Sequence, residues 1–111
     1  MDLSILESEL IEQYYREQRA LAVHEEALAS CRKGYISVKF INDRPQYYLQ
    51  WREGATVRSK YIKSKDYVNV KNEIAARKEH EKSIKHIKKN MKQIERVVGK
   101  KKIDEFRDLA R

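Results

Sequence analysis

Residues 34–63 read GYISVKFINDRPQYYLQWREGATVRSKYIK, and this stretch decides the fold. Apolar and aromatic side chains recur in it at every second position, which is the spacing of a β-strand with one buried face. Turn-forming residues separate the three runs, at Asn42-Asp43-Arg44-Pro45 and at Glu53-Gly54. The pattern predicts a three-stranded antiparallel meander over residues 35–63. Its buried face is expected to hold Ile36, Val38, Phe40, Tyr47, Leu49, Trp51, Val57 and Tyr61.

The intervening positions form the opposite face of the predicted sheet, because neighbouring side chains on a strand point to opposite sides. This face is expected to hold Tyr35, Ser37, Lys39, Tyr48, Gln50, Arg52, Thr56, Arg58 and Lys60. Aromatic rings stack on nucleic-acid bases, and Arg and Lys bind phosphates and guanine edges. We therefore take Lys39, Tyr48, Gln50, Arg52, Arg58 and Lys60 as candidate nucleic-acid contacts. The alternatives for this face are an ordinary solvated surface and a contact with another protein.

A long helix is predicted before the meander, over residues 2–32, where the chain has no Gly or Pro. Asp2 or Ser4 is the expected N-cap, and Gly34 marks the end of the helical stretch. A heptad-like stripe runs along this helix through Leu3, Leu6, Leu10, Tyr14, Glu17, Leu21, His24, Leu28 and Cys31.

A second long helix is predicted over residues 65–98, with Ser64 or Asp66 as its N-cap and Gly99 as its breaker. A short final helix is predicted over residues 102–110, where apolar residues recur at Ile103, Phe106 and Leu109. The apolar stripe of the second helix holds Val70, Ile74, Ile84, Ile87, Met91, Ile94 and Val98. Together these elements predict one α+β domain over residues 1–111. The two long helices are expected to pair as an antiparallel hairpin in one chain or, alternatively, between two copies in a homodimer.

The chain is strongly basic, with 25 Lys and Arg against 17 Asp and Glu in 111 residues. The charge is uneven: residues 1–33 carry 4 cations against 7 anions, and residues 64–111 carry 15 against 8. A net charge of +8 favours a polyanionic partner such as DNA or RNA. We add Lys82, Lys85 and Lys89, on the outer face of the second helix, as candidate phosphate contacts.

No arrangement of residues typical of an enzyme is found in the sequence. The three histidines, His24, His80 and His86, lack the spacing of a metal site, and the single Cys31 cannot form an intramolecular disulfide. The three glycines form no phosphate-binding loop. We therefore expect no catalytic residue, no metal and no cofactor. The sequence also has no long apolar run, so we expect a cytoplasmic protein that does not enter the membrane.

The segments Gly34-Tyr35-Ile36, Tyr47–Gly54 and Val57–Ile62 together resemble a known signature, GYI…YYxQWREGxKVxSKYI. It is found in a small uncharacterised family of low-GC Gram-positive bacteria and of their phages and plasmids. The resemblance implies a helix-flanked meander and a mobile-element context, but no activity. Here Ala55-Thr56 stands where the family commonly has a lysine.

The sequence favours a small nucleic-acid-binding accessory protein that uses the polar sheet face and the Lys-rich helix. An alternative is a protein-binding inhibitor or adaptor, for example an anti-CRISPR protein that acts on a host nucleoprotein. A structural coiled-coil module is the third interpretation.

Overall fold

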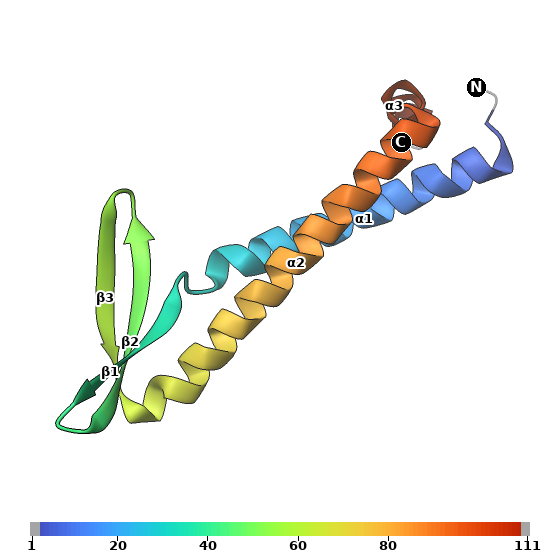
Figure 1. Ribbon diagram of the computed structural model, residues 1–111. Coiled ribbons are helices and arrows are strands. Elements are labelled where there is room, and N and C mark those ends of the chain that lie inside the picture. Colours follow the sequence, from blue (N-terminus) through green and yellow to red (C-terminus); the bar gives the residue numbers. More distant parts are fainter. Residues whose placement is uncertain (1–2, 110–111) are drawn as a thin grey trace. The chain divides into compact units, whose positions relative to one another are not determined.

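The computed structural model describes residues 3–109 and confirms an α+β protein. Asp2, one of the two predicted caps, and Ala110, the last predicted helical residue, lie outside the described residues. Figure 1 shows the elements in chain order: α1 (Ile5–Ser30), β1 (Tyr35–Ile41), β2 (Arg44–Glu53), β3 (Thr56–Ile62), α2 (Tyr67–Val98) and α3 (Lys100–Leu109). A 3-10 turn (Ser64–Asp66) precedes α2.

The chain divides into two compact units. The helical unit comprises residues 1–26 and 81–111, and the sheet unit comprises residues 27–80. Helix α2 contributes its first turns to the sheet unit and the rest to the helical unit. Among the described residues, no helix is both long and apolar enough to cross a membrane.

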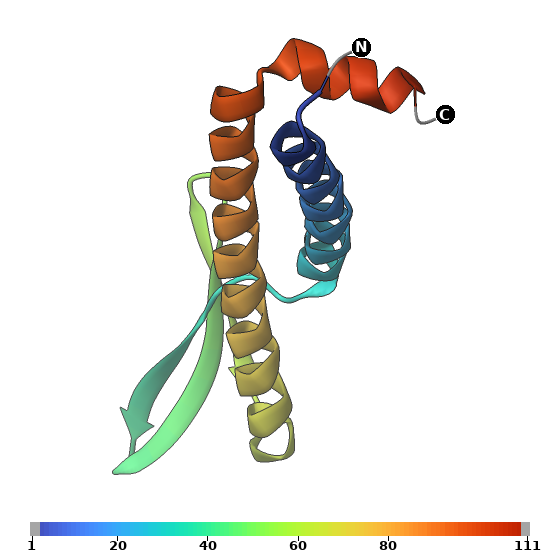
Figure 2. The same ribbon diagram turned by 90° about the vertical axis from the view of Figure 1, so that its right-hand side faces the viewer.

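The core of the helical unit lies where α1, α2 and α3 meet (Figure 2). Its buried residues are Ile11, Ile94, Val98 and Ile103. Ile11 is completely buried, although it does not belong to the stripe predicted for the first helix. The predicted stripe omits Ile11 because it allows for one partner helix. Helix α1 packs against both α2 and α3, so more of the surface of α1 is buried.

Polar contacts join the helices of this unit within one chain. The Tyr14 hydroxyl donates to Oε1 of Glu95 at 2.8 Å, and the Tyr15 hydroxyl donates to the carbonyl oxygen of Ile103 at 2.8 Å. Partial burial, together with the hydrogen bond to Glu95, raises the pKa of Tyr14 to about 12. Of the two pairings that the sequence left open, the intrachain hairpin is therefore the one in this structure.

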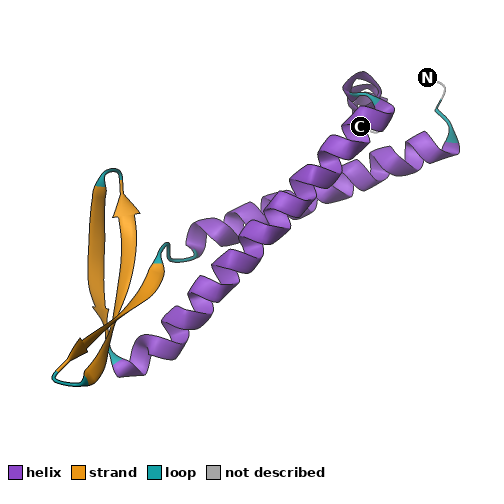
Figure 3. Ribbon diagram, in the orientation of Figure 1, coloured by secondary structure: helices purple, strands orange, loops and turns teal. Residues whose placement is uncertain are grey.

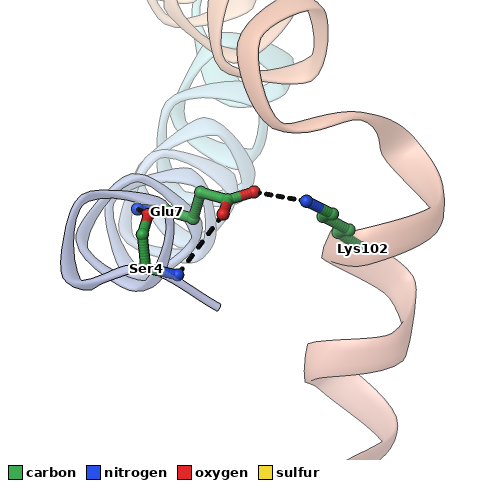
Figure 4. Close-up of polar contacts among 3 residues, drawn as sticks. All are labelled: Ser4, Glu7 and Lys102. Carbon is green, nitrogen blue, oxygen red and sulfur yellow. Dashed lines mark hydrogen bonds and ion pairs between the residues drawn. The ribbon is translucent and has the colours of Figure 1, made fainter. Parts of the chain in front are cut away.

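A capping box begins α1 (Figure 4). The Ser4 hydroxyl accepts the backbone N–H of Glu7 at 3.0 Å, and the Glu7 carboxylate accepts the backbone N–H of Ser4 at 3.3 Å. Lys102 of α3 donates to the same carboxylate at 2.7 Å, and this bond lowers the pKa of Glu7. Ser4 is thus the cap, and Glu7 also links the start of α1 to α3.

The three strands form an antiparallel sheet in the order β1-β2-β3 (Figure 3). Asn42 and Asp43 both have positive φ angles, 52° and 64°, and alone form the turn between β1 and β2. Arg44 and Pro45 were expected in this turn but belong to β2. Pro45 is tolerated there because β3 pairs with β2 only from Tyr47 onward, so the missing N–H breaks no bond to β3.

The first turns of α2 cover one face of the sheet. Leu49 and Ile62 are buried against Val70 and Ile74, and the ring centroids of Tyr47 and Tyr67 lie 4.4 Å apart. The segment before β1 is held to the same helix, because Arg32 forms an ion pair with Glu73 at 3.3 Å. The meander therefore has one covered face, as the sequence predicts, but Val38 and Phe40, which were expected to be buried on it, lie outside this core and are exposed.

Candidate nucleic-acid interface

The register of the strands determines which side chains share the face that α2 does not cover. In β1 and β2, Ile36 lies opposite Leu49, and both face α2. The residues next to them in each strand, and every second residue from there, point away from α2. In β3, Tyr61 lies opposite Tyr48 and Ser59 lies opposite Gln50. We call this surface the open face; it comprises Tyr35, Ser37, Lys39, Ile41, Arg44, Gln46, Tyr48, Gln50, Arg52, Val57, Ser59 and Tyr61.

Four of the six predicted sheet contacts share the open face: Lys39, Tyr48, Gln50 and Arg52. The other two, Arg58 and Lys60, do not. Lys60 lies opposite Leu49, and Arg58 lies opposite Trp51, so both belong to the covered face. The prediction that one face holds all four cations was wrong.

The reason for this error is that β3 has apolar residues of both parities. Val57 and Tyr61 were assigned to the buried face, but Ile62, the next residue along, is the one that packs against Val70 and Ile74. Burying Ile62 turns Val57 and Tyr61 outward, and both are about half exposed. The sequence does show that Ile62 is apolar and stands next to Tyr61, but it does not show which of the two is buried.

A row of aromatic and cationic groups crosses the open face. Nζ of Lys39 lies 4.8 Å from the centroid of the Tyr48 ring, which is within the range of a cation–π contact. The Tyr48 and Tyr61 rings meet edge to face with centroids 5.6 Å apart. The three strands therefore each contribute one member of a continuous row, and Lys39 and Tyr61 at its ends are exposed.

Arg58, one of the two predicted cations that lie on the covered face, has an acidic neighbour. Glu53 accepts a hydrogen bond from Nε1 of Trp51 at 3.0 Å and forms an ion pair with Nε of Arg58 at 3.1 Å. A phosphate would have to compete with this carboxylate for Arg58. Charge alone therefore does not make the covered face an equivalent binding surface.

The three candidate lysines of the second helix, Lys82, Lys85 and Lys89, are in the helical unit and are exposed. They lie on the side of α2 opposite its buried residues Ile87 and Ile94. The row of cations continues through Lys92 and Arg96, and the acidic residue within residues 82–96 is Glu95, which accepts the hydrogen bond from the Tyr14 hydroxyl. This arrangement can bind phosphates but carries no aromatic group.

Among the described residues, no three His, Cys, Asp or Glu side chains are grouped so that they could hold a metal ion. The geometry defines a small α+β protein with a helix-backed meander whose other face is open. The chain belongs to the family described as a domain of unknown function, DUF6788, which matches residues 2–72. No curated protein and no solved structure matches the chain. The matched segment contains the whole open face, whereas Lys82, Lys85 and Lys89 lie beyond it.

Proposed function

We propose that this protein binds nucleic acid through the open face, as an accessory protein and not as an enzyme. The observation that carries the proposal is the row of Lys39, Tyr48 and Tyr61 across three strands. Rings presented on a sheet surface stack on bases of any sequence, and flanking cations bind the phosphates between them. Arg52 and Gln50, on the same face, add a guanidinium fork and an amide that can hydrogen-bond to base edges.

The basic stripe of α2 supports a second, less specific contribution. Lys82, Lys85 and Lys89 present charge at helical spacing, and such charge contributes affinity that does not depend on base sequence. We assign the open face the role of binding bases and the stripe the role of binding phosphates. The resemblance described above further suggests an origin in a phage or another mobile element.

The proposal is tested by titrating the protein into labelled single-stranded and duplex oligonucleotides of one sequence, followed by fluorescence anisotropy over a series of salt concentrations. We expect binding that weakens as salt rises, with tighter binding to the single strand because its bases are free to stack on tyrosine. Absence of binding to DNA and to RNA at low salt would contradict the proposal.

A second candidate function is that of an inhibitor or adaptor that binds another protein, as anti-CRISPR proteins do. It is favoured by the exposure of Tyr35, Val57 and Tyr61, which are 57%, 55% and 48% exposed, since aromatic and aliphatic groups anchor protein interfaces. Affinity capture with and without nuclease treatment separates the two functions. A partner protein that stays bound after nuclease treatment favours the second candidate.

A further inference from the structure

The two edge strands of the sheet differ in how well they are protected against pairing with another strand. In the order β1-β2-β3, both β1 and β3 present one row of backbone N–H and C=O groups outward. Strand β3 has two cations, Arg58 and Lys60, in its seven residues, and β1 has only Lys39. Charged side chains on an edge oppose pairing with a further strand. Strand β1 lacks most of this protection.

Strand β1 is also apolar and exposed. Only Ile36 of this strand packs against the covered core, whereas Val38, Phe40 and Ile41 are 46%, 74% and 49% exposed. Val38 and Phe40 point to the same side as Ile36 but are not part of the core that α2 forms with β2 and β3. An edge strand with a single cation and exposed large apolar side chains is a surface that another β-strand would cover.

We propose that β1 pairs with β1 of a second copy of this chain, antiparallel and about a two-fold axis at Val38. Val38 is the central residue of the strand Tyr35–Ile41, so this register pairs all seven residues. It places Ile36 opposite Phe40 of the second copy and Val38 opposite itself, so every pair on the covered side is apolar. Charge also selects this register.

In the proposed register, Lys39 lies opposite Ser37 of the second copy, so no like charges face each other. A shift of the axis to Lys39 would instead set the two Lys39 side chains against each other. A two-fold axis perpendicular to the sheet keeps each face on its own side. The dimer would therefore have a six-stranded sheet in which two open faces become continuous.

The dimer is tested by sedimentation velocity of the full chain over a range of concentrations. We expect a reversible shift from 13.3 kDa to twice that mass. Val38→Lys should raise the dimer dissociation constant by about tenfold or more, because it sets two new cations opposite each other. Val57→Lys is the matched control, since Val57 is an exposed valine on the other edge strand, and it should leave the dissociation constant unchanged.

The register is tested separately by oxidative cross-linking, with Cys31 replaced by Ser to remove the native thiol. We expect Val38→Cys to form a disulfide between copies, because residues directly opposite each other come within bonding reach. Lys39→Cys should not, because the two Cys side chains would lie two residues apart along the strands. A monomer at every concentration, a dimer unaffected by Val38→Lys, or equal cross-linking by both Cys variants would overturn the proposal.

Discussion

The covered and open faces of the sheet carry the same kinds of residue but use them differently. On the covered face, Tyr47 packs against Tyr67, and Arg58 is paired with Glu53. On the open face, Tyr48 and Tyr61 contact each other and Lys39, and no helix of the sheet unit covers them. The same residue types thus contact α2 or an acidic neighbour on one face and remain uncovered by α2 on the other. The comparison predicts that mutations on the two faces have separable effects.

The largest effect is expected from truncating the covered face. Leu49→Ala should lower the free energy of unfolding of the sheet unit by about 3 kcal/mol, because it leaves a cavity beneath α2. Val57→Ala, which shortens an exposed side chain on the open face, should cost less than about 0.5 kcal/mol. Both values follow from denaturant unfolding monitored by the fluorescence of Trp51, the single tryptophan. Equal losses of unfolding free energy in the two variants would show that the covered face does not stabilise the fold more than the open face.

A smaller effect is expected at Gly34, the residue that immediately precedes β1. Gly34 has a φ angle of +118°, and a Cβ atom there would collide with the carbonyl oxygen of Gln50. Gly34→Ala should therefore cost about 2 kcal/mol of unfolding free energy. Gly54→Ala is the matched control, since Gly54 also has a positive φ angle, +60°, but open space around it. It should cost about 1 kcal/mol, and a cost as large as that of Gly34→Ala would refute the steric explanation.

The order of helices and strands could be predicted from the sequence because the apolar residues recur at helical spacing in the two flanking segments and at every second position in β1 and β2. In β1 and β2 the covered core takes residues of only one parity, such as Ile36 and Leu49, and the sequence assigned these correctly. The apolar periodicity does not show which residues of β3 are buried, because Tyr61 and Ile62 are adjacent and either could face the core. Only packing against Val70 and Ile74 selects Ile62.

The same limit applies to the candidate site. Lys39, Tyr48, Gln50 and Arg52 were grouped correctly because they lie on two strands whose parity was clear. Tyr61 was missed and Arg58 was misplaced because both depend on the third strand. Ile11 was missed for a related reason, since the contact with Ile103 of α3 involves residues far apart in the sequence.

The central claim is that the open face binds nucleic acid, and charge reversal on the two faces tests it most directly. Arg52 and Arg58 form a matched pair, because both are exposed arginines of adjacent strands and they point to opposite faces. By anisotropy with a single-stranded oligonucleotide at fixed salt, Arg52→Glu should weaken binding about tenfold, through loss of one phosphate or base contact. Lys85→Glu, on the stripe of α2, should weaken it about threefold, and Arg58→Glu by less than about twofold. An equal loss in all three variants would mean that binding follows net charge alone, and a larger loss at Arg58 than at Arg52 would place the ligand on the covered face.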